Sequence, residues 1–138
     1  MISLFYAGAI GIMAIVLAFL TIRQRFISSV SLGDGDNENL LRAQRAHGNF
    51  LEYSIIFLIL SFALEFFGNI PDIAIGILGD FFILGRILHF YALSNKNSNI
   101  LFRQAGILFS FLTILTQSIW AILISSQWLL GNNFGLNF

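Results

Sequence analysis

Charged and amide side chains gather at the head of one long apolar stretch of this chain. Residues 42–53 read RAQRAHGNFLEY, and the uncharged run SIIFLILSFAL follows at once. On a helix each residue advances by about 100°. One helix face, within an arc of roughly 100°, then carries five polar side chains: Arg42, Arg45, Asn49, Glu52 and Tyr53. A charge inside a bilayer is costly and usually faces a partner or a water-filled cavity, so this face is the main candidate for a binding site.

A pocket that combines arginines, a carboxylate and an amide suits a small zwitterionic or anionic ligand. Arginine pairs with carboxylates in a bidentate geometry. Glu52 could hold an ammonium group or order Arg45, and Asn49 offers both a donor and an acceptor. The same face continues inward with apolar side chains, namely Ile56, Leu60 and Ala63. That continuation would receive a lipophilic co-substrate.

The elements that must position this face are apolar enough to lie in a membrane. Of the 138 residues, 57% are hydrophobic and 10% are charged, with a mean hydropathy of +0.85. Soluble domains carry about 25% charged residues. A chain of this length favours one domain, here residues 1–138. The composition and the long apolar runs predict an all-α membrane protein with a single four-helix bundle.

Four membrane-crossing helices are expected, at about residues 2–25, 38–67, 71–93 and 100–129. Residues 2–22 carry no charge, and about 20 residues span a hydrocarbon core. A secretory signal peptide is the alternative for this run. No Lys or Arg precedes it, however, and it is longer than the apolar region of about 7–15 residues in such signals. We therefore expect an uncleaved first helix.

The connection between the first two helices contains Gly33-Asp34-Gly35-Asp36, which is turn chemistry. Its Asp-Gly-Asp pattern resembles part of a calcium loop, but the remaining ligand positions of such a loop are missing. We interpret it as a solvated loop that leads into the second helix. Asp36 or Asn37 is the expected N-cap of that helix.

The composition excludes several kinds of chemistry. The chain has no cysteine, so the protein itself has no disulfide, no thiolate nucleophile and no Cys-ligated metal. Thiol chemistry would need a thiol that a ligand brings. The two histidines, His47 and His89, are too few for an all-His metal site. We expect no metal and no nucleic-acid partner.

The distribution of basic residues predicts the orientation of the chain. All Lys and Arg residues lie at the end of the helices that joins the first to the second and the third to the fourth: Arg23, Arg25, Arg42, Arg45, Arg86, Lys96 and Arg103. The opposite side has Glu65 and Asp72 but no Lys or Arg. The positive-inside rule places the 1–2 and 3–4 loops in the cytoplasm and both termini outside.

The third and fourth helices bring further chemistry-capable side chains to the same membrane face. The third carries Arg86, His89 and Tyr91, and the fourth begins with Arg103 and Gln104. Arg86 and His89 share a helix face, whereas Tyr91 is about 200° from His89. One pocket cannot easily hold both His89 and Tyr91. This favours an oligomer with sites between subunits.

These residues also have structural interpretations. Arg23, Arg25, Arg42 and Arg103 could be interfacial anchors, and His89 could be a packed helix residue. Glu52 and Arg86 could form a structural ion pair.

The remaining polar residues inside the helices predict contacts between helices. For Asp80 we expect a structural partner on another helix. Ser110, Thr113 and Gln117 follow one another at helical spacing and predict interhelical hydrogen bonds.

Three segments together resemble the MAPEG family, the membrane-associated proteins in eicosanoid and glutathione metabolism. They are GDGDNENLLRAQRAHGNFLEY at 33–53, GRILHFYALS at 85–94 and FRQAG at 102–106. The resemblance is greatest to small bacterial members and covers essentially the whole chain. The Arg-x-x-x-Asn-x-x-Glu-Tyr pattern of residues 45–53 is its most specific part.

The resemblance implies a four-helix membrane bundle that assembles as a homotrimer in the bacterial inner membrane. It also implies that glutathione, as co-substrate, binds between subunits near the cytoplasmic face. The residues implied to contact it are Arg45, Asn49, Glu52, Tyr53, Arg86 and His89. Arg103 is the implied catalytic residue, because a cation beside a thiol lowers the pKa of that thiol and raises the thiolate fraction. Many eukaryotic members have a tyrosine four residues after the His89 position, where this chain has Leu93; Tyr91, on a different face, is the nearby candidate.

The expected function is a glutathione transferase or peroxidase that acts on lipophilic electrophiles or lipid hydroperoxides. Its expected partners are glutathione, a lipophilic small molecule, membrane lipid and further copies of the chain. The alternative is a non-catalytic membrane scaffold in which the polar face is a structural ion network. A small transporter is disfavoured, because the charges cluster at one face and form no relay across the bilayer.

Overall fold

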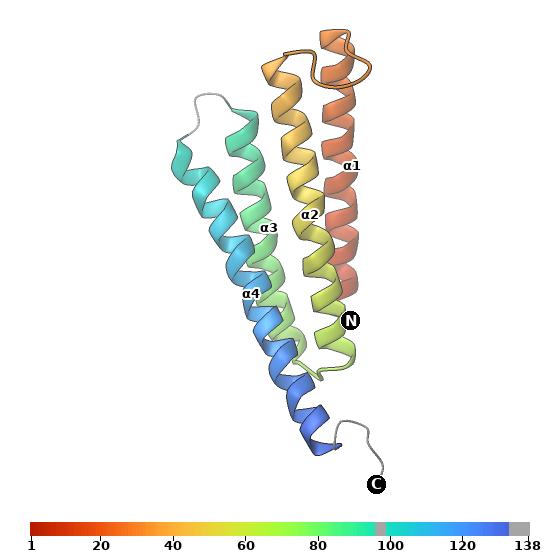
Figure 1. Ribbon diagram of the computed structural model, residues 1–138, viewed down its shortest axis with the longest axis vertical. Helices are drawn as coiled ribbons and strands as arrows, with labels where there is room; N and C mark the ends of the chain where they lie inside the picture. Colours follow the sequence, from red (N-terminus) through yellow and green to blue (C-terminus); the bar gives the residue numbers. More distant parts are fainter. Residues whose placement is uncertain (96–98, 133–138) are drawn as a thin grey trace.

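The computed structural model describes residues 1–95 and 99–132, which form four α-helices and no strand. The helices are α1 (Ile2–Ser28), α2 (Glu38–Phe66), α3 (Asp72–Ser94) and α4 (Ile100–Gly131). They run up and down side by side along one long axis (Figure 1). Lys96, one of the basic residues used to predict the orientation, lies outside the described residues.

The two ends of the bundle differ in what they carry. At one end, here called the loop end, α1 joins α2, α3 finishes and α4 begins (Figure 1). At the other, here called the N-terminal end, lie Met1 and the short turn between α2 and α3 (Figure 1). Helix α1 packs mainly against α2, and α3 packs mainly against α4. This alternation brings the polar starts of α2 and α4 and the polar end of α3 together at the loop end.

All four helices are long and apolar enough to cross a membrane. Large apolar side chains cover their outer faces, including Phe19 on α1, Ile59 on α2 and Leu115 on α4. Apolar side chains on an outer face make favourable contacts with lipid tails but not with water. The predicted all-α fold with four long apolar helices is confirmed, whereas a homotrimer stays a prediction because the structure contains one chain.

Local chemistry sets the ends of the α1–α2 connection. Helix α1 continues past Arg25 and ends where Ser29 takes a left-handed conformation, with φ 56° and ψ 33°. Asn37, one of the two expected N-caps, accepts a hydrogen bond from the backbone N–H of Leu40 at 3.0 Å. Such a cap satisfies one of the free amide groups at a helix start. The second helix therefore begins at Glu38, as its sequence signals indicate.

Stacked aromatic rings and two glycines hold the helices together. The rings of Phe57 and Phe82 are stacked at a centroid distance of 4.1 Å, in a cluster that also buries Tyr6 and Ile10 of α1. Helices α3 and α4 cross at Gly85 and Gly106. A Cβ atom on Gly106 would lie 2.6 Å from the carbonyl oxygen of Gly85, so any larger residue would force the two helices apart.

Acidic side chains at the N-terminal end have partners on α1. The hydroxyl of Tyr6 donates to Oδ1 of Asp80 at 2.7 Å and lies as close to the carbonyl oxygen of Gly76. The expectation that Asp80 has a structural partner on another helix is confirmed.

The amine of Met1 and the backbone of Ser3 bind the two remaining acids of this end. Glu65 accepts from the backbone N–H of Ser3 at 2.9 Å and pairs with the amine of Met1. Asp72 lies 3.3 Å from the same amine. The hydrogen bond with Glu65 raises the pKa of this amine above its ordinary value.

Among the residues that the structure describes, one of the three polar side chains predicted to bond between helices does so. Gln117 of α4 donates to the hydroxyl of Ser61 on α2 at 2.7 Å. The predictions for Ser110 and Thr113 are wrong within the described residues. Their hydroxyls donate to backbone carbonyls of α4 itself, at 2.9 and 3.0 Å. Backbone carbonyls three and four residues earlier compete successfully for short hydroxyl side chains in a helix.

Candidate functional site

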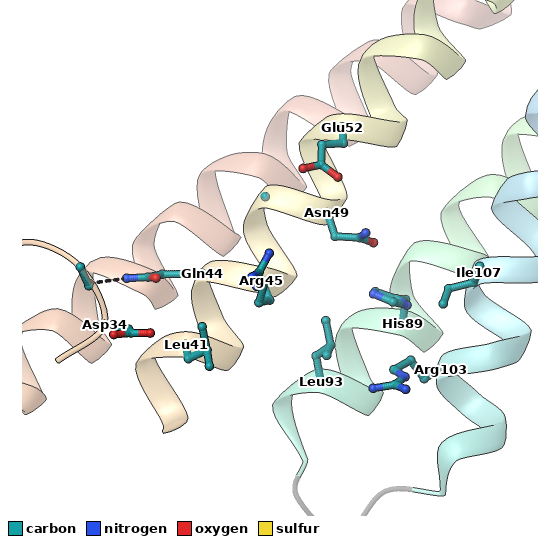
Figure 2. A pocket seen from close by; sticks show the side chains of 12 residues that line it. Asp34, Leu41, Gln44, Arg45, Asn49, Glu52, His89, Leu93, Arg103 and Ile107 are labelled. Carbon is teal, nitrogen blue, oxygen red and sulfur yellow. Dashed lines mark hydrogen bonds between the residues drawn. The ribbon is translucent and has the colours of Figure 1, made fainter. Parts of the chain in front are cut away.

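A cavity of about 700 Å³ opens at the loop end of the bundle. Helix α2 forms one wall, the facing ends of α3 and α4 form the other, and the α1–α2 connection forms the rim (Figure 2). Its lining comprises Gly33, Asp34, Leu41, Gln44, Arg45, Gly48, Asn49, Glu52, His89, Leu93, Arg103 and Ile107. The volume falls in the range of about 300–1,000 Å³ typical of small-molecule sites. We call this cavity the loop-end pocket.

The α2 wall presents three of the predicted residues to the loop-end pocket: Arg45, Asn49 and Glu52. Helical spacing places them on one side of α2, and Figure 2 shows Asn49 extending from α2 toward α3. Among the residues that the structure describes, Arg45 and Glu52 form no ion pair and no side-chain hydrogen bond. Their charges are therefore available to a ligand or to another copy of the chain.

The opposite wall brings His89 of α3 and Arg103 of α4 to the same space (Figure 2). His89 is buried and hydrogen-bonds with the backbone of Arg103, while its Nδ1 atom has no partner in the described part of the chain. The guanidinium of Arg103 is exposed and, within residues 1–95 and 99–132, binds no other side chain. One free cation thus stands on each wall of the pocket.

Arg86 lies behind the pocket wall and does not line it. It is 2% exposed. Nη1 donates to Oδ1 of Asn49 at 3.0 Å and Nη2 donates to the carbonyl of Gly106 at 3.2 Å. No ion pair joins Arg86 to Glu52 in the described structure, so the structural pair considered from the sequence is not found within one chain. Arg86 instead ties α2, α3 and α4 together and orients the Asn49 amide.

The two predicted tyrosines also lie outside the pocket lining. Tyr53 packs beneath the Arg86 guanidinium, whose Cζ is 4.9 Å from the ring centroid, and against Phe111 at 5.6 Å between centroids. Tyr91 is 49% exposed and meets Phe102 edge to face at 5.7 Å. The structure therefore separates Tyr91 from His89, as the 200° between them predicts.

Sequence reasoning missed the rim and part of the α2 wall. The rim consists of Gly33 and Asp34, which were interpreted as a solvated loop; nothing in the pattern gives the path of this loop. The extra α2 residues, Leu41, Gln44 and Gly48, could have been found. They precede Arg45, Asn49 and Glu52 at helical spacing, so the lining face is rotated by roughly 60° from the predicted arc. That rotation also removes Arg42 and Tyr53 from the pocket.

An apolar groove adjoins the polar pocket on α4. It has a volume of about 590 Å³ and is lined by Leu101, Gln104, Ala105, Ile107, Leu108 and Phe111. Ile107 lines both spaces. A polar ligand in the loop-end pocket would therefore lie next to a surface suited to an apolar one. No group of three potential metal ligands exists among the described residues.

Gly48 is not a point of close helix contact within the described chain. A glycine inside a membrane helix suggests close approach of another backbone, but a Cβ atom on Gly48 would meet nothing within 4 Å in this chain. Gly48 borders the open pocket instead.

Comparisons with known proteins agree with this architecture. The chain is 30% identical to inner membrane protein YecN of Escherichia coli strain K12 over 96 residues, which cover 70% of this chain and 72% of that protein. The YecN protein of Escherichia coli O6:H1 strain CFT073 matches to the same extent. No solved structure matches significantly. The four candidate spans and these inner-membrane relatives support a multi-pass inner membrane protein.

A family model places the chain among known proteins. The model described as the MAPEG family matches residues 3–123, which include all the lining residues of the loop-end pocket. This match covers most of the 138 residues and confirms the resemblance found in the sequence. The chain belongs to the MAPEG family.

Proposed function

We propose that this protein binds glutathione in the loop-end pocket and joins its thiol to lipophilic electrophiles or uses it to reduce lipid hydroperoxides. The observation that carries the proposal is that the polar loop-end pocket lies next to the apolar groove on α4. A pocket in which two guanidinium groups and the Glu52 carboxylate have no side-chain partner among residues 1–95 and 99–132 adjoins an apolar groove through Ile107. Family membership supports the same choice of ligand.

The charges of the pocket complement those of the ligand. Glutathione has two carboxylates, one ammonium group and one thiol, and arginine is the side chain best suited to carboxylates. Arg45 binds a carboxylate of the ligand, Asn49 hydrogen-bonds to its peptide groups, and Glu52 either holds its ammonium group or orders Arg45. Arg86 acts from behind by fixing the orientation of Asn49.

Arg103 acts on the thiol. Arg103 lines the loop-end pocket and lies four residues before Ile107, the α4 residue that lines both the pocket and the apolar groove. A cation at this place stabilises the thiolate form of the ligand. In conjugation, the thiolate sulfur forms a bond to the electrophilic carbon, and the leaving group departs with its electron pair. In peroxide reduction, two glutathione molecules are oxidised to the disulfide, while the hydroperoxide is reduced to an alcohol and water.

We propose that three copies assemble and complete the site between subunits. In one chain the loop-end pocket is open, and the side chains of Arg45, Glu52 and Arg103 have no side-chain partners within the described residues. A neighbouring copy would close the pocket and exclude water from the charges. The positive-inside rule favours a cytoplasmic loop end, because Arg23, Arg25 and the pocket arginines all lie there.

A calorimetric titration of the purified protein with glutathione tests the proposal. We expect saturable binding that Arg45→Ala weakens by roughly tenfold or more, because a charge-assisted bond to a carboxylate is lost. Arg42→Ala is the matched control, since Arg42 is already paired with Glu38 at 2.8 Å and lies outside the pocket lining. No heat of binding, or equal losses in both variants, would sink the proposal.

The scaffold alternative has one observation in its favour. Buried Arg86 bridges α2, α3 and α4 and has a structural role that needs no ligand. The alternative predicts that Glu52→Gln or Arg86→Ala dissociates the oligomer with or without glutathione. Size-exclusion chromatography with light scattering distinguishes the two functions: the glutathione-site proposal expects Glu52→Gln to stay assembled.

A further inference from the structure

Asp80 is an acidic side chain on the outer face of a helix long and apolar enough to cross a membrane. It is exposed in the chain and lies outside the loop-end pocket. The residues one turn to either side on the same face, Ile77 and Leu84, are also exposed, and both are apolar. The outer face of α3 therefore presents a carboxyl group within an apolar surface.

The depth of Asp80 follows from its position along α3. It comes eight positions after Asp72, the first residue of this helix, which is about 12 Å along the helix axis. A hydrocarbon core is about 30 Å thick, and the 23 residues of α3 extend over about 35 Å. Asp80 thus lies about a third of the way along the crossing. Its side chain is too short to extend back to the aqueous boundary, unlike those of lysine and arginine.

Within residues 1–95 and 99–132, one side chain binds the Asp80 carboxyl. The Tyr6 hydroxyl of α1 donates to Oδ1 at 2.7 Å, whereas Oδ2 has no hydrogen bond and no ion pair in this part of the chain. Gly79 makes room for the Tyr6 ring, because a Cβ atom there would overlap it. The arginine of the same helix, Arg86, is buried and donates its hydrogen bonds toward α2 and α4. No cation therefore neutralises Asp80 among the described residues.

We propose that Asp80 is a lipid-facing carboxylic acid that carries a proton, and that lipid-soluble carbodiimides modify it from the bilayer. An ionised carboxyl with one hydrogen bond and no cation is costly in an apolar medium, and uptake of a proton removes that cost. Tyr6 still donates to Oδ1, which is then the carbonyl oxygen of the acid, and the proton lies on Oδ2. Asp80 is then a proton-binding site that is open to the bilayer.

A carbodiimide reacts with this form of the carboxyl group. The acid O–H adds across one C=N bond of the reagent: the carboxyl oxygen bonds to the central carbon, and the proton moves to a nitrogen. No group leaves, so the protein gains the full mass of the reagent. Asp72, in contrast, lies at the end of the helix beside the Met1 amine. An ionised acid at this boundary brings no proton to a reagent dissolved in the bilayer.

The test treats membranes that contain the full-length protein with N,N′-dicyclohexylcarbodiimide, which partitions into the bilayer, or with a water-soluble carbodiimide. We expect the lipid-soluble reagent to add an adduct that peptide mass spectrometry locates at Asp80, and the water-soluble reagent to leave Asp80 unmodified. Asp80→Asn should lose the adduct and keep the fold, because its amide oxygen still accepts from Tyr6. Asp72→Asn is the matched control, since it removes an exposed acid of the same helix; the yield of the Asp80 adduct should stay at the wild-type value.

Infrared spectroscopy of the purified protein, in a detergent without carbonyl groups, detects the proton directly. A neutral carboxyl group has a carbonyl stretching band that a carboxylate lacks, and we expect a band of this kind that Asp80→Asn removes. The proposal is overturned if Asp80 stays unmodified in membranes, if the water-soluble reagent modifies it equally fast, or if Asp80→Asn leaves the band unchanged. Modification that occurs only after detergent has dissociated an assembly would also overturn it, because another copy would then cover this face of α3.

Discussion

The two ends of the bundle differ in whether their charged side chains have partners within the chain. At the N-terminal end, Glu65, Asp72 and Asp80 each have a partner from the first residues of the chain: the Met1 amine, the Ser3 amide or the Tyr6 hydroxyl. At the loop end, Arg45, Glu52 and Arg103 have no side-chain partner within the described ranges 1–95 and 99–132. Both ends are polar, but within the described ranges the unpartnered charges of the pocket lie at the loop end, whereas the three acids of the N-terminal end are all bound.

This difference separates structural polar groups from groups that can bind a ligand. A charge near the hydrocarbon core is costly unless it is paired or hydrated, so charges left open in a cavity bind water, a ligand or another copy of the chain. Arg86 shows that the loop end also contains satisfied groups. It lies one layer behind the open pocket, with Asn49 and the Gly106 carbonyl as its partners. We expect the charged side chains that are bound within the chain to determine its stability. We expect the charged side chains of the loop-end pocket that have no partner in the described residues to determine ligand binding.

Arg86→Ala should give the largest effect on stability. The variant leaves the side-chain oxygen of Asn49 without its Arg86 donor, removes one of the donors to the Gly106 carbonyl, and opens a cavity against the Tyr53 ring. Together these changes cost about 2–4 kcal/mol. Thermal unfolding in detergent, followed by circular dichroism, measures this loss. Arg45→Ala is the matched control, because the Arg45 side chain has no side-chain partner among the described residues. This variant should unfold at the wild-type temperature. Equal losses in the two variants would break the distinction between satisfied and open arginines.

Gly106→Ala should come next, because its Cβ atom would lie 2.6 Å from the Gly85 carbonyl oxygen and 2.7 Å from the backbone nitrogen of His89. Moving two packed backbones apart costs about 1–3 kcal/mol. Gly48→Ala provides the control, since a Cβ atom there meets nothing within 4 Å. It should stabilise α2 by about 0.5–1 kcal/mol. A destabilised Gly48→Ala variant would show that another copy approaches α2 at this position.

Arg103→Ala should change activity and not stability. Without the cation, the pKa of the bound glutathione thiol rises, so the thiolate fraction at neutral pH falls by roughly tenfold for each unit of pKa. The pH dependence of the conjugation rate should shift to higher pH, and the ultraviolet absorbance of bound thiolate should decrease. Arg42→Ala, which removes an arginine at the same end of the bundle but outside the linings of both the pocket and the apolar groove, is the control. An unshifted pH profile would remove Arg103 from the reaction.

Tyr6→Phe should give the smallest effect. It removes the bond to Asp80 and keeps the ring in the core, at an expected loss of about 0.5–1.5 kcal/mol. Because this bond lies at the N-terminal end, glutathione affinity should stay at the wild-type value. If Tyr6→Phe weakened glutathione binding as strongly as Arg45→Ala, the two ends would not be functionally separate.

Much of this arrangement follows from helical periodicity. A single helix fixes the relative directions of its side chains, so Arg45, Asn49 and Glu52 could be assigned to one wall from the sequence alone. The separation of His89 from Tyr91 followed from the same geometry. The partner of Asp80 was predicted as a class, because an acid inside a membrane helix must be satisfied.

Other features depend on how the helices rotate and approach one another, which periodicity does not give. The predicted arc on α2 included Tyr53, but the rotation of α2 turns that ring toward Arg86 and Phe111. The depth of Arg86 depends on the close approach of α3 and α4 at two glycines. Asp34 could not be placed, because the path of its loop depends on two distant donors, Arg25 and Gln44.

The most direct test is a structure of the protein determined with glutathione. The account predicts an assembly of three copies, with ligand density at the loop end between subunits, beside Asn49 and Glu52 and with the ligand sulfur near Arg103. An empty pocket in which Arg45, Glu52 and Arg103 pair with charges of a neighbouring copy would contradict it.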